Sequence, residues 1–201
     1  REALAAVVRA GVRHLVLSPG SRSAPLAFAA YDLAAAGVVR LHTRIDERSA
    51  GFLALGLGKA GSPTAVFCTS GTAVANLHPA VLEAAHAGVP LVVLTADRPA
   101  RLRGTGANQT TDQRGIFGPE VAALDLSAAD LDGAQNPARL IGNVLGERGW
   151  MSPLQVNLQF DEPLLPPGPW ADLPVAGQWT AVHPRRAPRR APGRRSSSPR
   201  R

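Results

Sequence analysis

An acidic pair, Asp46-Glu47, separates a short apolar run from a row of apolar residues at helical spacing. The run at 38–43 predicts a strand, and the row that follows predicts a helix that stops at Gly61. Glu47 is therefore expected at a helix start, where a carboxylate is electrostatically favoured and capping is the ordinary explanation. In open α/β sheets, however, ligands bind at the carboxyl ends of the strands. This position makes Glu47 a candidate ligand-binding residue.

Further polar stretches follow other predicted strands. Residues 18–23 (Ser-Pro-Gly-Ser-Arg-Ser) combine hydroxyls, backbone N–H groups at a helix start and an arginine, which suits an anion such as a carboxylate. Residues 69–72 form a second polar turn, and Asp97 and Arg98 adjoin after another strand, where a weak surface ion pair is the alternative. Residues 104–113 form a long loop rich in amide side chains. Each stretch alone is weak evidence for a binding site. Their expected convergence at one sheet edge is stronger evidence than any single stretch.

The elements that must position these stretches alternate regularly along the chain. Strands are expected at 14–17, 38–43, 64–69, 90–95, 121–126 and 154–158, and helices lie between most of them. Strands that are continuous apolar runs, alternating with helices of ten or more residues, predict an α/β fold. We expect a parallel sheet flanked by helices on both faces.

Composition limits the class of protein. Hydrophobic residues make up 45% of the chain, which is enough for a core, and no apolar run approaches the length of a membrane span. The single cysteine, Cys68, excludes an intramolecular disulfide framework and is expected to be a buried structural thiol. Since the first residues show no basic and apolar signal pattern, we expect a cytoplasmic protein without membrane contact.

The net charge of +7 is concentrated at the end of the chain. Residues 180–201 contain eight arginines and no acid, and removing these eight from the 22 basic residues leaves 14 against 15 acidic ones. A basic patch on a folded domain would indicate nucleic-acid binding, whereas here the charge is confined to a tail. We expect no specific nucleic-acid partner, and a basic arm for nucleic acid or a membrane surface is the alternative.

Residues 1–162 are expected to form one domain. Residues 163–179 predict a linker, because their proline density cannot continue a strand or a helix. Residues 180–201, built mainly from Arg, Pro, Ala and Ser, are expected to be disordered. One lysine against 21 arginines indicates GC-rich coding DNA. Translation of such DNA in another reading frame gives sequences rich in Arg, Pro, Ala and Ser. We therefore interpret the tail as the product of a frameshift or truncation.

In series, the polar stretches resemble the N-terminal, pyrimidine-binding domain of thiamine-diphosphate-dependent enzymes. The resemblance covers residues 1–162 and rests on five motifs, Ser18-Pro-Gly-Ser-Arg-Ser23, Arg44-Ile-Asp-Glu-Arg48, Cys68-Thr-Ser-Gly-Thr-Ala-Val-Ala-Asn-Leu77, Leu94-Thr-Ala-Asp-Arg-Pro99 and Gly106-Ala-Asn-Gln-Thr110. Members of the menaquinone pathway, which decarboxylate 2-oxoglutarate and add the succinyl unit to isochorismate, are most similar. The resemblance implies thiamine diphosphate with Mg²⁺ or Mn²⁺ as cofactors, and a homodimer or homotetramer of the complete enzyme.

The resemblance also implies roles for single residues. Glu47 matches the glutamate that hydrogen-bonds the cofactor's aminopyrimidine N1′ and favours the imino tautomer, whose nitrogen deprotonates the thiazolium carbon. Residues 70–72 (Ser70, Gly71 and Thr72) match cofactor-binding positions. The positions expected around the carboxylated substrates are Ser21, Arg22, Arg98, Asn108 and Gln109.

One part of the family pattern has no counterpart in the chain. The diphosphate and metal site of these enzymes, a Gly-Asp-Gly unit with a downstream Asn, belongs to a C-terminal domain, and Asp132-Gly133 lacks the preceding glycine. We therefore expect no metal ligand here and no activity from the chain alone. The alternatives are another enzyme of the class, similar to acetolactate synthase, and a noncatalytic partner subunit that retains the interface.

Overall fold

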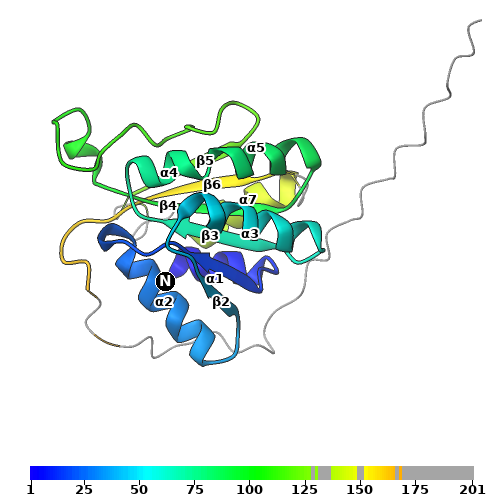
Figure 1. Cartoon of the computed structure of the whole chain (residues 1–201). Coiled ribbons are helices and arrows are strands. Elements are labelled where there is room, and N and C mark those ends of the chain that lie inside the picture. Colours follow the sequence, from blue (N-terminus) through cyan, green and yellow to red (C-terminus); the bar gives the residue numbers. More distant parts are fainter. Residues whose placement is uncertain (128–129, 131–136, 149–151, 166–167, 169–201) are drawn as a thin grey trace, which may run out of the picture.

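The computed structural model describes residues 1–127, 130, 137–148, 152–165 and 168. Its centre is a six-stranded sheet in the order β2-β1-β3-β4-β6-β5, and every neighbouring pair of strands is parallel (Figure 1). The strands are β1 (His14–Leu17), β2 (Arg40–Thr43), β3 (Thr64–Cys68), β4 (Leu91–Asp97), β5 (Ala122–Leu126) and β6 (Leu154–Gln159). The predicted α/β fold with a parallel sheet is confirmed.

Helices cover both faces of this sheet. They are α1 (Glu2–Arg9), α2 (Ala24–Ala35), α3 (Glu47–Lys59), α4 (Thr72–Asn76), α5 (His78–Ala87) and α7 (Pro137–Arg148), with single 3₁₀ turns η1 (Ser21–Ser23) and η2 (Ala100–Leu102). Alternate strand residues face α1, α2 and α7 on one side, where Leu15 and Phe67 lie in the core. Their neighbours, Val16 and Val66, face α3, α4 and α5 on the other side. The two-sided burial explains why the strands read as continuous apolar runs.

Several boundaries differ from the prediction: β2 begins at Arg40, two residues later than expected, and two further differences have physical reasons. The helical stretch expected between the strands at 64–69 and 90–95 is divided into α4 and α5, because Pro79 cannot continue a helix through its own position and instead occupies the first turn of α5. Strand β4 runs two residues beyond the expected end at Thr95. Asp97 is therefore part of the sheet and fully buried.

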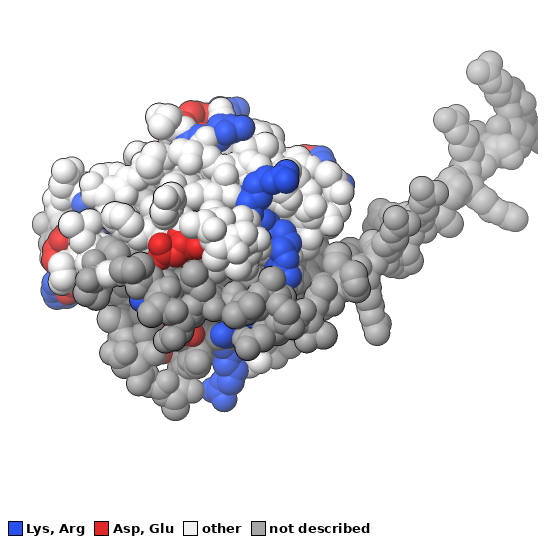
Figure 2. Space-filling view, turned by 90° about the horizontal axis from the view of Figure 1, so that it is seen from below, with Lys and Arg blue, Asp and Glu red and all other residues white. Residues whose placement is uncertain are grey.

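The predicted linker and tail lie partly or wholly outside the described residues. Of the predicted linker at 163–179, the structure describes only 163–165 and 168, and the tail at 180–201 lies outside the described residues. Within the described chain, no helix is both long and apolar enough to cross a membrane. In the view of Figure 2, Lys and Arg side chains lie in several separate patches, one of them a short band, and Asp and Glu patches lie on the same face.

Candidate active site

The crevice between β1 and β3 brings two of the predicted polar turns together. The chain leaves β1 toward α2 on one face and leaves β3 toward α4 on the other, which makes this a topological switch point of the sheet. The turns that follow these strands are in close contact, since a Cβ added to Gly20 would lie 2.4 Å from the Cβ of Thr69. Glycine at position 20 thus permits the turns at 18–23 and 69–72 to adjoin at the carboxyl end of the sheet.

Glu47 is the first residue of α3, and its carboxylate is not used for capping. The side chain of Asp46 caps the helix, accepting a hydrogen bond from the Ser49 backbone N–H at 2.7 Å. Glu47 is half-buried and continues the helix face on which Ala50 and Ala54 are buried. Among the described residues, its carboxylate has neither a hydrogen bond nor an ion pair. A free carboxylate therefore stands at the start of α3.

Glu47 lies close enough to Cys68 for its charge to act on the Cys68 thiol. Burial raises the pKa of the Cys68 thiol, and the negative charge of Glu47 raises it further. Cys68 is the last residue of β3, so Glu47 lies near the carboxyl end of that strand. The predicted burial of this cysteine is confirmed, and its raised pKa makes it a poor nucleophile.

Three of the predicted site residues form one hydrogen-bonded cluster above β3 and β4. The guanidinium of Arg98 donates to Ser70 Oγ at 2.6 Å and to the carbonyl of Gln109 at 2.8 Å. Ser70 Oγ donates to the same carbonyl at 3.0 Å, and Gln109 Nε2 donates back to the Ser70 carbonyl at 3.2 Å. The polar loop is thereby folded onto the turn at 69–72, as the convergence of the motifs predicted.

Gly71 completes the turn in a conformation that other residues rarely adopt. Its φ is +79°, and a Cβ at this position would lie 2.9 Å from the Gln109 carbonyl oxygen. Its N–H donates to the side-chain oxygen of Gln113 at 2.7 Å. The remaining predicted members, Thr72 and Asn108, lie beside this cluster in sequence and are exposed.

The alternative that Arg98 pairs with Asp97 on the surface is wrong. Asp97 is buried at the end of β4 and forms an ion pair with Arg103 at 3.0 Å. Arg103 also donates to both carboxylate oxygens of Asp125, at 2.8 and 3.0 Å. Only the backbone N–H of Arg98 contacts Asp97, at 2.7 Å. Because β4 extends to residue 97, the carboxylate of Asp97 faces inward. The side chain of Arg98 is therefore available to bind the turn at 69–72.

The turn at 18–23 contains polar atoms without partners. Arg22 donates to the Phe160 carbonyl at 3.0 Å and lies 3.4 Å from a carboxylate oxygen of Glu162. The buried Arg22 Nε and the buried Ser18 Oγ, by contrast, have no hydrogen-bond partner within the described chain. Ser21 is exposed at the start of this turn. Buried polar groups are normally paired, so these two atoms indicate a place where a polar ligand or water is bound.

Sequence reasoning missed a buried polar network beneath the loop. Its members are Thr95 and Asp97 of β4, Asp125 of β5, Gln155, Asn157 and Gln159 of β6, and Gln113 of the loop. All these strand residues point to the sheet face that the loop covers. A loop has free backbone groups that need partners, as shown where Gly115 N–H donates to Gln155 Oε1 at 3.1 Å. The alternation Leu-Gln-Val-Asn-Leu-Gln at 154–159 was the available signal.

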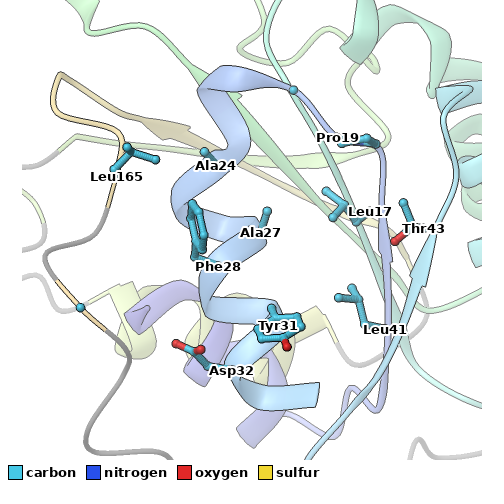
Figure 3. Close-up of a pocket in the computed structure, with 12 residues that line it drawn as sticks. Leu17, Pro19, Ala24, Ala27, Phe28, Tyr31, Asp32, Leu41, Thr43 and Leu165 are labelled. Carbon is cyan, nitrogen blue, oxygen red and sulfur yellow. The ribbon is translucent and has the colours of Figure 1, made fainter. Parts of the chain in front are cut away.

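Two cavities lie elsewhere on the described chain. One of about 830 Å³ has a mostly apolar lining from α2 (Phe28 and Tyr31), from β1 and β2 (Leu17 and Leu41) and from Leu165 (Figure 3). The other, of about 600 Å³, is formed by charged, hydroxyl-bearing and small residues within the loop at 103–114. Neither is lined by any of the predicted site residues. Within the described residues there is also no cluster of three or more His, Cys, Asp or Glu side chains that could hold a metal ion.

Comparison with known proteins defines the class of this fold and site. The family model described as thiamine pyrophosphate enzyme, N-terminal TPP binding domain, matches residues 1–116. The chain therefore belongs to the thiamine pyrophosphate enzyme family and contains its N-terminal domain.

Three similar curated proteins share one name, 2-succinyl-5-enolpyruvyl-6-hydroxy-3-cyclohexene-1-carboxylate synthase. The chain is 60% identical to that of Nocardioides sp. over 178 residues, which are 89% of this chain and 30% of the relative. It is 55% identical to that of Kineococcus radiotolerans over 192 residues, 90% of this chain and 34% of the relative. It is 51% identical to that of Saccharopolyspora erythraea over 191 residues, 88% of this chain and 34% of the relative. The chain thus spans about a third of the length of the curated relatives that it matches.

Proposed function

We propose that the chain supplies the pyrimidine-binding part of a thiamine-diphosphate-dependent synthase of menaquinone biosynthesis. The complete enzyme decarboxylates 2-oxoglutarate and adds the succinyl unit to isochorismate. The names of the relatives support this reaction. The observation that carries the proposal is the free, half-buried carboxylate of Glu47 beside the switch-point crevice, since Asp46 already caps α3.

The residues present fit one end of the cofactor. Glu47 offers an acceptor or a shared proton to the N1′ atom of an aminopyrimidine, and the turn at Ser70, Gly71 and Thr72 lines the same end of the sheet. When bound, thiamine diphosphate supplies an acidic thiazolium carbon that can add to a 2-oxo acid. Glu47 acts by holding a proton at N1′, and a positioned acid or base of this kind contributes about 10²- to 10⁴-fold to a rate. No group of three or more His, Cys, Asp or Glu side chains among the described residues could hold a metal ion, and we assign the diphosphate end with its Mg²⁺ or Mn²⁺ to another part of the complete enzyme.

The substrate carboxylates are assigned to the arginine-bearing turns. Arg22 is 86% buried, and its Nε, like Ser18 Oγ, is free for an anion at the turn that begins with Ser21. Arg98 carries a second positive charge beside Gln109 and the exposed Asn108. Arginine forms strong, charge-assisted hydrogen bonds with carboxylates, which both proposed substrates contain.

The proposal extends to the complete protein. It is a homodimer or homotetramer that uses Mg²⁺ or Mn²⁺, works in the cytoplasm and has no nucleic-acid or membrane partner. Neither cavity in the described chain is lined by the proposed residues, and we assign the rest of the binding site to the remaining part of the complete enzyme.

A chimera tests the proposal. Residues 1–162 replace the corresponding first part of the Nocardioides synthase, and the product is assayed for thiamine diphosphate binding and for turnover of 2-oxoglutarate with isochorismate. We expect the chimera to bind the cofactor and to form the product, with the intact Nocardioides enzyme as the control. A folded chimera that binds no thiamine diphosphate would show that this domain does not contribute a cofactor site.

A further inference from the structure

Gln113 is a glutamine with no exposed surface, although it lies on a long surface loop. Polar side chains of this size are rarely buried without a specific set of partners. Its side-chain oxygen accepts the Gly71 N–H at 2.7 Å, and its side-chain nitrogen donates to the Ala96 carbonyl at 3.1 Å and to Asn157 Oδ1 at 2.9 Å. Both N–H groups of the amide are thus used, and its oxygen faces the turn at 69–72.

The network behind Gln113 dictates which way its amide points. The carboxylates of Asp97 and Asp125 can only accept, and Asn157 Nδ2 donates to them at 2.9 and 2.8 Å. Asn157 Oδ1 must therefore face the opposite way, where it accepts from Thr95 Oγ1 at 2.8 Å and from Gln113. Gln113 can only present its nitrogen to that oxygen. Its own oxygen is left directed at Gly71.

The contact with Gly71 holds a conformation that the turn would not keep unaided. Gly71 is buried with a φ of +79°, so its N–H would be a buried donor without a partner if Gln113 were removed. The turn is bound by the loop at a second point, where Ser70 and Gln109 exchange hydrogen bonds. Arg98 also links Ser70 to Asp97, but the contact of Gln113 is the one that binds the Gly71 N–H.

We propose that Gln113 is a positioning residue for the cofactor-binding turn. Because the orientation of Asn157 is fixed, the side-chain oxygen of Gln113 is held toward the Gly71 N–H. This contact positions Ser70, Gly71 and Thr72 for the ligand, and Gln113 itself does not touch the ligand. This inference rests on the proposed function, because the turn is assigned to thiamine diphosphate there.

The test compares Gln113→Met with Gln155→Met. Gln155 is an equally buried glutamine of the same network, but its side chain contacts Gly115, the Gln113 carbonyl and Thr95 and does not reach the turn. Hydrogen exchange of the Gly71 amide is measured in the full 201-residue chain, and the dissociation constant of thiamine diphosphate is measured in the chimera. Gln113→Asn, which is one methylene shorter, is the variant to use if the Met variant does not fold.

With Gln113→Met or Gln113→Asn, we expect Gly71 exchange to be faster and cofactor affinity to fall about tenfold, equivalent to about 1.4 kcal/mol. The KM for 2-oxoglutarate at saturating cofactor should stay within about twofold of the wild-type value, because the substrate arginines are not part of this contact. Gln155→Met should lower the melting temperature and leave both turn readouts unchanged. Wild-type affinity in the Gln113 variants, or an equal loss in Gln155→Met, would overturn the inference. Failure of the wild-type chimera to bind the cofactor would instead contradict the proposed function on which the inference rests.

Discussion

Asp46 and Glu47 are adjacent carboxylates at the start of α3 with different surroundings. Asp46 has a structural role, whereas Glu47 is the proposed catalytic residue. Hydrogen bonds from Ser49 lower the pKa of Asp46, as expected for a side chain that caps a helix. Glu47 has no such partner among the described residues and lies near Cys68 instead. The position next to a cap is therefore available for a ligand, whereas the cap itself is occupied.

Arg22 provides a prediction about substrate recognition. In the chimera, Arg22→Ala should raise the KM for a carboxylated substrate about tenfold or more, because a hydrogen bond between charged groups in a sheltered site is worth about 1.5–3 kcal/mol. The dissociation constant of thiamine diphosphate should change little. Arg101→Ala is the control, since Arg101 pairs with Asp161 on the exposed surface, with 2.8 Å between nitrogen and oxygen. Steady-state kinetics that give the same small effect for both variants would assign Arg22 a structural role only.

The candidate residues could be predicted from the sequence where they follow strands, but their partners could not. Ser70, Arg98 and Gln109 were expected at one sheet edge and form one cluster there. Gln113 was not singled out, because a buried glutamine on a loop looks like a solvated one in the sequence. Its importance depends on Asn157, 44 residues away, which pairs with it only in the folded chain.

At the scale of elements, Arg103 attaches the loop after β4 to the sheet. It joins the buried carboxylate of Asp97 to that of Asp125 on β5. Arg103→Met should lower the free energy of unfolding by about 3 kcal/mol, because Asp97 would be left as a buried charge without its cation. Chemical denaturation of the 201-residue chain measures this loss. A change under about 1 kcal/mol, similar to that for the exposed Arg101, would mean that the ion pair does not hold the loop.

The edge formed by β1 and β2 provides a prediction about pH. His14 Nδ1 and His42 Nε2 lie 3.0 Å apart, and their rings are stacked. Burial lowers the pKa of both imidazoles, assisted by Arg40 for His14 and by His14, Arg44 and Arg40 for His42. The unfolded chain therefore takes up protons on these rings before the folded chain does. Stability should be fully present above about pH 6.5 and should be lost as pH falls through the lowered values.

Thermal unfolding between about pH 7.5 and about pH 5 tests this linkage. The double variant His14→Gln, His42→Gln should show a flatter dependence of the melting temperature on pH in this range. His86→Gln is the control, because His86 lies on the exposed surface 3.8 Å from Glu120. Equal slopes for the wild type and the double variant would show that the histidine pair does not couple protonation to folding.

The elements themselves were largely predictable, and the exceptions have local causes. Apolar runs located all six strands, because both faces of the sheet are buried. The division between α4 and α5 follows from Pro79, a signal that was present but was outweighed by the helical spacing around it. The extension of β4 to Asp97 was not predictable, since an aspartate is accepted inside a sheet only when distant partners such as Arg103 neutralise it.

For the whole molecule, the proposal predicts that the 201-residue chain does not turn over 2-oxoglutarate and isochorismate by itself. The chain spans about a third of the length of its relatives, and we propose that the divalent metal that would anchor the cofactor's diphosphate is bound by another part of the complete enzyme. An assay with added thiamine diphosphate and Mg²⁺ should therefore give no product, whereas the chimera gives product under the same conditions. Robust turnover by the purified chain would contradict the assignment of the diphosphate site to another part of the enzyme.

The most direct test of the proposed role of Glu47 is the variant Glu47→Gln in the chimera. The readout is hydrogen–deuterium exchange at the thiazolium carbon of bound thiamine diphosphate. Glutamine keeps the size of the side chain but cannot hold the proton at N1′, so exchange should slow by about 10²- to 10⁴-fold while the melting temperature is nearly unchanged. Asp46→Ala is the matched control and should show the reverse pattern, a lower melting temperature with normal exchange, because it removes the cap of α3. Wild-type exchange in Glu47→Gln would show that this carboxylate does not activate the cofactor.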